Sequence, residues 1–252
     1  MTSTLAPAPG AAPLPRMLLA QTAFETRLLL RNGEQLLLTV IIPFVLLALL
    51  VAVPVLDAGD VRKVDFLVPG IIALAVMSTA FTSLAIATGF ERRYGVIKRL
   101  GSSPLPRSGL LLGKVGALLL VEALQIVVLS AVALALGWEP RPAFLPALLA
   151  IVLGTAAFAS LGLFVAGVLR AEATLAAANL VYLLLLAGGA VVLPSSAYGS
   201  FGAVTEVVPS GALGNALRHA FWSGSFHWTS MLVLLVWAAV GAVLTARTFT
   251  WE

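Results

Sequence analysis

Residues 89–114 read GFERRYGVIKRLGSSPLPRSGLLLGK and lie between two long apolar runs of the sequence. This stretch holds six of the fifteen lysine and arginine residues of the chain: Arg92, Arg93, Lys98, Arg99, Arg107 and Lys114. The rest of the chain is mostly apolar segments joined by short connections. A dense basic loop in such a chain indicates which side of a membrane the loop occupies.

Bulk composition predicts a membrane protein. The 252 residues are 60% hydrophobic and only 10% charged, with a mean hydropathy of +1.06, whereas soluble domains carry about 25% charged residues. The net charge of +4 would suggest nucleic acid in a soluble protein, but cytoplasmic loops account for it here, so we expect no nucleic-acid partner. The absence of cysteine excludes disulfides and thiol catalysis.

The apolar runs predict an all-α polytopic protein with six transmembrane helices, because about 20 apolar residues cross the hydrocarbon core. The expected spans are residues 36–56, 66–90, 110–136, 143–169, 174–193 and 229–247. Together they form one transmembrane domain from residue 16 to residue 252. Residues 1–15 are rich in proline and alanine, and we expect a disordered tail there without a cleaved signal peptide.

Two further segments are expected to lie at the membrane without crossing it. Residues 16–35 predict an amphipathic helix on the membrane surface, with one apolar stripe at helical spacing: Met17, Ala20, Phe24 and Leu28. A cytoplasmic extension of the first span is the alternative. Residues 194–228 contain too much glycine and proline to cross but are too apolar for an ordinary loop, which favours a re-entrant outer segment of short helices.

The distribution of basic residues predicts the orientation. Eleven lysines and arginines fall on the side that holds the N-terminus and the 89–114 stretch, and four fall on the other: Arg62, Lys63, Arg141 and Arg218. By the positive-inside rule, both termini and the basic stretch lie in the cytoplasm of a multi-pass cell-membrane protein.

Candidates for chemistry are few. Glu122 is the only ionisable residue well inside an expected span, and it is a candidate proton carrier for secondary transport or else a glutamate facing a polar bundle interior. His219 and His227 are candidate metal or haem ligands or, with Trp222, interfacial belt residues. Residues 109–115 fail as a phosphate loop because no Ser or Thr follows the lysine. We therefore expect neither an enzyme nor a bound cofactor.

Residues 91–106 predict a short amphipathic helix with its own stop signal. Val96, Ile97 and Leu100 form the expected apolar face, and residues 101–106 (GSSPLP) end the helix. Such a helix suits docking in the groove of a partner protein. A topology signal or a contact with anionic lipid is the alternative.

Three stretches of the sequence resemble the ABC-2 type permeases, the membrane subunits of ABC exporters that include the daunorubicin-resistance-like drug exporters. The first is DFLVPGI at residues 65–71, and the second is ERRYGVIKRL at 91–100 with Ser103-Pro104 and Gly113-Lys114 after it. The third runs from residue 208 to residue 218. The match covers nearly the whole chain.

The resemblance implies a dimer, with a second permease copy or a paralogue, on two separate ATPase subunits that bind ATP and Mg²⁺. The coupling helix would contact the ATPase through Glu91, Arg92, Arg93, Gly95, Val96, Ile97, Lys98, Arg99, Leu100 and Pro104. It further implies export by alternating access.

The substrate is expected to be lipophilic or amphiphilic, such as a drug or a lipid, because the membrane segments carry few charges. The residues that could line its cavity are polar members of the second and fifth spans: Thr79, Thr82, Ser83, Asn179 and Tyr182. Ordinary interhelical hydrogen bonds are the alternative for each of them. A non-transporting membrane assembly subunit is the remaining alternative for the whole chain.

Overall fold

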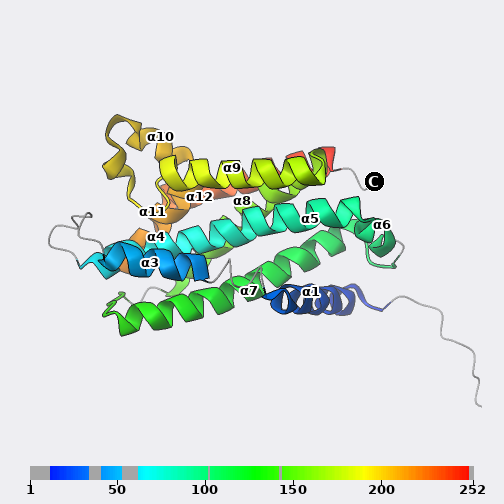
Figure 1. The fold of residues 1–252 in the computed structure, drawn as a ribbon, viewed down its shortest axis with the longest axis horizontal. Helices are drawn as coiled ribbons and strands as arrows, with labels where there is room; N and C mark the ends of the chain where they lie inside the picture. Colours follow the sequence, from blue (N-terminus) through cyan, green and yellow to red (C-terminus); the bar gives the residue numbers. More distant parts are fainter. Residues whose placement is uncertain (1–11, 34–40, 53–61, 102, 142–143, 250–252) are drawn as a thin grey trace, which may run out of the picture.

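The computed structural model describes residues 12–33, 41–52, 62–101, 103–141 and 144–249. Within these ranges, five helices are long and apolar enough to cross a membrane: Lys63–Arg93, Ser108–Ala135, Phe144–Val168, Ala171–Gly188 and Trp228–Thr248. They run along the long axis of the molecule (Figure 1). The all-helical character expected of the sequence is confirmed for the described residues.

The expected first span, 36–56, is described only as α3 (Ile42–Ala52), an apolar helix of 11 residues that packs on α4. Residues 36–40 and 53–56 of that span lie outside the described residues, as do residues 1–11 of the expected tail.

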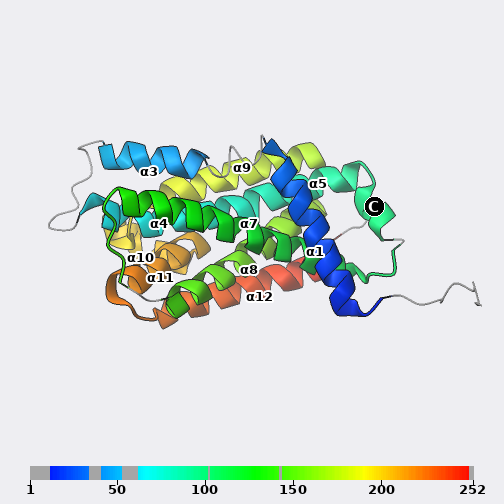
Figure 2. The same ribbon diagram turned by 90° about the horizontal axis from the view of Figure 1, so that it is seen from below.

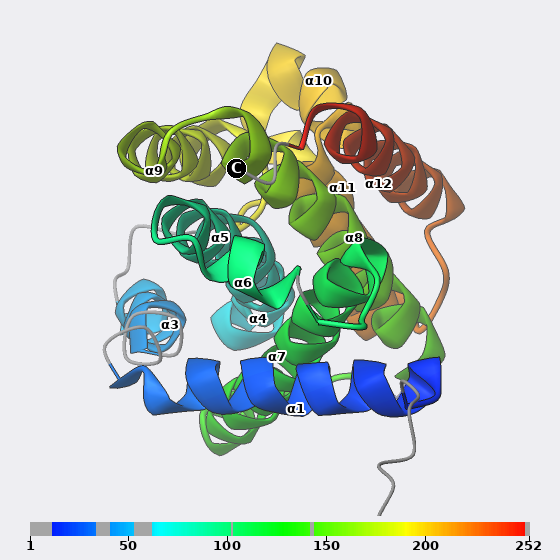
Figure 3. The ribbon, with the colours of Figure 1, turned by 90° about the vertical axis from the view of Figure 1, so that its right-hand side faces the viewer.

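One continuous helical segment occupies the centre of the bundle. It consists of α4 (Lys63–Met77), the π-helical turn η2 (Ser78–Ser83) and α5 (Leu84–Arg93). Nearly all of α4 is buried, including Leu67, Ile72 and Leu74, because its sequence is apolar on every face. Helices α3, α7 (Arg107–Ala135), α8 (Phe144–Val168) and α9 (Ala171–Gly188) surround this segment (Figure 3), and α12 (Trp228–Thr248) packs along α8.

Helix α1 (Leu14–Arg31) crosses one end of the bundle and packs on α7 (Figures 2 and 3). Its polar face is the packed one, since Gln21 and Thr22 contact the backbone of α7 at Gly113 and Gly116. The apolar residues Phe24 and Leu28 are exposed. An apolar face turned outward is what a helix lying in the membrane interface requires.

The expected fifth span, 174–193, is helical only as far as Gly188, the last residue of α9. Residues 189–194 leave the helix, yet Ala190 and Val191 are fully buried between α4 and α11 (Pro209–Ser223). Short helices follow: η3 (Ser195–Phe201), α10 (Gly202–Val207) and α11. Within the described part of residues 189–227, none of these helices is long enough to cross a membrane.

Candidate functional site

A five-residue helix, α6 (Val96–Leu100), follows α5 at the same end of the molecule that α1 crosses (Figure 1). Gly95 separates it from α5 and adopts a left-handed conformation, with φ of 69°, which glycine tolerates best. The expected apolar face is divided: Ile97 is buried, Leu100 is half-buried and Val96 is exposed. Pro104 is also exposed, at the end of the segment. The outward surface of α6 therefore combines one valine with the two basic residues Lys98 and Arg99.

Glu91, at the end of α5, belongs to a buried ion cluster inside the protein. The Lys114 Nζ of α7 lies 2.6 Å from one Glu91 carboxylate oxygen and 3.0 Å from the Glu25 carboxylate of α1. Gln21 donates a further hydrogen bond of 2.8 Å to Glu25. The cluster joins α1, α5 and α7 at a single lysine. Sequence reasoning missed this pairing, although Lys114 stood as a lone cation at the start of an apolar run.

Arg92 and Arg93 also have partners inside the chain. The Arg92 guanidinium donates hydrogen bonds to the carbonyl oxygens of Ala166, in the last turn of α8, and of Leu169, just after it. Carbonyl groups at the end of a helix have no partner within the helix. Arg93 forms an ion pair with Glu172 in the first turn of α9. Both arginines therefore tie the end of α5, next to α6, to the α8–α9 connection.

The polar residues expected to line a cavity do not gather at one site. The buried Thr79 donates a 3.0 Å hydrogen bond to Gln125 of α7, whereas Tyr182 of α9 interacts with Ser78. Asn179 lies on an exposed side of α9 and bonds its own backbone at Leu175. Two other members of the set, Thr82 and Ser83, are half-buried in η2.

Glu122 lies one turn from Gln125 and is buried where α7 faces α8. Its carboxylate accepts a 2.5 Å hydrogen bond from the Thr155 hydroxyl of α8. The other carboxylate oxygen has no hydrogen-bond partner among the described residues. Glu122 and Thr155 thus form a polar contact between two apolar helices.

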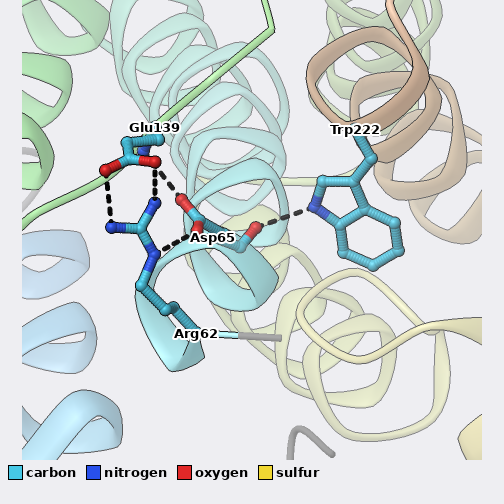
Figure 4. A network of polar contacts seen from close by, with 4 residues as sticks. All are labelled: Arg62, Asp65, Glu139 and Trp222. Atoms are coloured by element: carbon cyan, nitrogen blue, oxygen red, sulfur yellow. Dashed lines mark hydrogen bonds and ion pairs between the residues drawn. The ribbon is translucent and has the colours of Figure 1, made fainter. Parts of the chain in front are cut away.

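The opposite end of the molecule is joined by a polar network (Figure 4). The Arg62 guanidinium binds Asp65 at 2.9 Å and Glu139 at 2.7 Å, and the Glu139 backbone N–H donates to Asp65. The Trp222 indole of α11 donates to the backbone carbonyl of Asp65. The start of α4, the α7–α8 connection and α11 are thereby held together.

His219 and His227 meet at this same end, with ring centroids 4.2 Å apart. His227 shares a 2.7 Å hydrogen bond with Ser230. No group of three or more metal-ligating side chains occurs among the described residues.

These features define a multi-pass helical membrane protein whose charged contacts concentrate at the two ends of its bundle. The family model for ABC-2 type transporters matches residues 17–222, and the chain belongs to that family. It is the membrane permease component of a transporter and is not itself catalytic, as expected of the sequence. Permeases of this family work with ATPase subunits and ordinarily bind no cofactor. A search of curated proteins finds no match to the chain.

Proposed function

We propose that the chain is the permease subunit of an ATP-driven exporter that moves a lipophilic or amphiphilic substrate, a drug or a lipid, out of the cytoplasm. Two permease copies, or one copy and a paralogue, enclose the path, and each rests on a separate ATPase. Residues 36–56 supply a sixth span, which puts both termini and α6 on one side of the membrane. The excess of basic residues on that side assigns it to the cytoplasm. The subtype is the daunorubicin-resistance-like drug exporter. Of the five expected cavity residues, Thr82 and Ser83 of η2 and Tyr182 of α9, which packs on η2, remain the candidates for lining the substrate cavity. Thr79 bonds α7 and Asn179 bonds its own helix instead.

The exposed surface of α6 carries this proposal. Val96, Lys98 and Arg99 face outward on a short helix that Ile97 anchors to the protein, and such a surface suits a complementary groove. Three residues at the end of α5, just before α6, hold α6 in place: Glu91, Arg92 and Arg93. Their ion pairs and hydrogen bonds connect this end of α5 to α1, α7, α8 and α9. Movement of α6 by the ATPase is then transmitted into the bundle.

The substitution Val96→Asp tests the docking role of α6. We expect it to weaken co-purification with the ATPase by about tenfold or more, because it replaces the exposed apolar side chain of α6 with a carboxylate. Substrate-stimulated ATPase activity falls with it. Val96 is preferred to Ile97 for this experiment, since Ile97 is buried in the permease itself and its replacement would disturb the fold.

Ser225→Asp is the matched control for this experiment. It adds the same charge at an exposed position on the opposite end of the molecule, and we expect it to leave ATPase binding unchanged. Stimulated ATPase activity that survives Val96→Asp at the level of this control would exclude α6 as the coupling element. Nucleotide-dependent substrate movement in proteoliposomes that hold the reconstituted complex would exclude the non-transporting assembly subunit.

The substitution Glu122→Gln distinguishes ATP-driven export from the proton-coupled alternative. If ATP drives transport, we expect the rate to stay within about twofold of the original protein, because a carboxamide oxygen still accepts the hydrogen bond of Thr155. Transport in proteoliposomes, measured with and without an imposed proton gradient, checks this. Transport that follows the gradient and is abolished by Glu122→Gln would instead assign the coupling to proton movement through this carboxyl group.

A further inference from the structure

A polar cavity of about 230 Å³ lies at the end of the molecule opposite α6. We name it the α11 pocket, after the helix that supplies half of its lining residues. Its lining residues include Ser195, Asn215, Arg218, His219, Trp222 and His227, and the exposed carboxylate of Glu206 also lines it. Drug-sized ligands fill pockets of about 300–1,000 Å³, so this cavity suits a head group or a small ion.

Arg218 is the cation of the α11 pocket, and only 2% of it is exposed. Its Nη atoms donate to the carbonyl oxygens of Val191, at 2.8 Å, and Ala190, and to the Asn215 side chain at 3.2 Å. All of these acceptors are neutral. Among the described residues no carboxylate forms an ion pair with Arg218, and its Nε has no hydrogen-bond partner there.

Burial lowers the pKa of Arg218 to about 10, which leaves the guanidinium protonated at neutral pH. A buried charge without a counter-charge is costly. Glu206 lines the same pocket, but among the described residues it forms no ion pair with Arg218. Arg218 therefore lies beside the cavity as a buried cation without a directly bonded counter-charge.

The neighbouring side chains offer hydrogen-bond donors to an anion. Asn215 donates a 3.0 Å hydrogen bond to the Ser195 oxygen, which leaves the Ser195 hydroxyl proton available to the cavity. The Nδ1 atom of His227 shares a hydrogen bond with the Ser230 hydroxyl. The Nε2 atom lies on the other side of the ring and takes no part in that bond. The stacked His219 and His227 add imidazole ring nitrogens at the side of the cavity. Burial and the neighbouring His227 lower the pKa of His219, so a neutral ring N–H is the donor that His219 offers.

We propose that the α11 pocket binds an oxyanion of the phosphate type, with Arg218 as counter-charge and Ser195, His219 and His227 as donors. The group belongs either to a lipid or amphiphile head group at the membrane surface on this end of the bundle or to a free anion. Trp222 and Trp228 border this region, and tryptophan is enriched at head-group level in membranes. The proposal does not depend on α6 or on ATP coupling.

The histidines provide a site-specific test, because the chain contains only two and both line this pocket. The full-length protein is labelled with ¹⁵N-histidine in a phosphorus-free detergent, and its imidazole NMR signals are recorded. One arm titrates inorganic phosphate, and a second arm titrates a short-chain phosphatidylglycerol. We expect both imidazole signals to shift in a saturable manner.

Three variants complete the test. Ser195→Ala removes one donor and leaves the direct acceptors of Arg218 in place, although Asn215 loses its bond to Ser195. We expect it to weaken binding by about tenfold. Arg218→Gln is expected to abolish binding. Arg141→Gln, an exposed arginine at the same end of the molecule, is the control and should bind as the original protein does.

A response to both probes assigns a site for free or lipid-borne phosphate, and a response to the lipid alone assigns a head-group site. Silent histidine signals in both arms would overturn the proposal, as would equal affinity of Ser195→Ala and Arg141→Gln. Because no ATPase or nucleotide is present, such a failure leaves the coupling role of α6 untouched.

Discussion

Replacement of Lys114 by methionine is expected to destabilise the permease by about 3 kcal/mol or more, because it leaves the carboxylates of Glu25 and Glu91 buried without their cation. Lys114 and Glu25 have side chains only 6% and 7% exposed, whereas Glu91 is 22% exposed, so water compensates for the lost partner only in part. For a chain of this length the loss corresponds to a fall in melting temperature of roughly 10 °C. Thermal unfolding in detergent micelles measures it.

Lys98→Met is the matched control for this substitution. It makes the same change at an exposed position of α6 and is expected to leave the melting temperature unchanged. A second variant separates charge from packing: Lys114→Met combined with Glu25→Gln and Glu91→Gln should recover more than half of the lost stability, since no buried charge remains. If Lys114→Met unfolds at the temperature of Lys98→Met, the ion cluster does not hold α1 to the bundle.

The sequence was sufficient to predict the class of protein and the family. Apolar runs near residues 66–90, 110–136, 143–169 and 229–247 predict helices because their length and hydropathy leave no other way to satisfy the backbone in hydrocarbon. The structure has long helices at these places, and the family match confirms the permease. Whether residues 36–56 cross the membrane stays a prediction.

Sequence reasoning could not predict contacts that depend on tertiary neighbours. Hydrophobic periodicity assigned Val96 and Ile97 to one face, but a helix of five residues is too short for periodicity to decide which residue meets the protein. Glu91 was expected to contact the ATPase, whereas its nearest cation is Lys114, 23 residues away in the chain. The role of Glu91 at the ATPase contact stays a prediction, and we now propose that Glu91 acts by holding α6 in place.

The end of α9 shows the same limit at another place. The residues AVVL at 190–193 continue an apolar run, and the sequence predicts that the helix continues with them. In the structure Ala190 has a φ of 52°, a conformation that costs about 1–3 kcal/mol outside glycine. Hydrogen bonds from Arg218, 28 residues later, to the carbonyl oxygens of Ala190 and Val191 help to hold it. The hydrophobic pattern of residues 190–193 gives no information about Arg218, so the end of the helix could not be predicted from it.

The close contact of residues 189–194 with α4 gives the second large expected effect. Gly70 of α4 faces the backbone of Val191 and Val192, and a Cβ atom added to it would lie 2.5 Å from the Val192 carbonyl oxygen and 2.8 Å from the Val192 Cα. Backbone atoms cannot rotate away as a side chain can. We therefore expect Gly70→Ala to destabilise the protein by about 1–3 kcal/mol through overpacking, measured by thermal unfolding in detergent.

Gly188→Ala is the control that makes this result specific. Gly188 ends α9 close to the same segment, and among the described residues an added Cβ there meets no atom within 4 Å. Alanine at a compatible helical position is neutral or stabilising by about 0.4–1 kcal/mol. The two substitutions should thus change the melting temperature in opposite directions or by clearly different amounts. Equal melting temperatures would mean that residues 189–194 do not pack against α4, and the buried position of Arg218 would lose its structural basis.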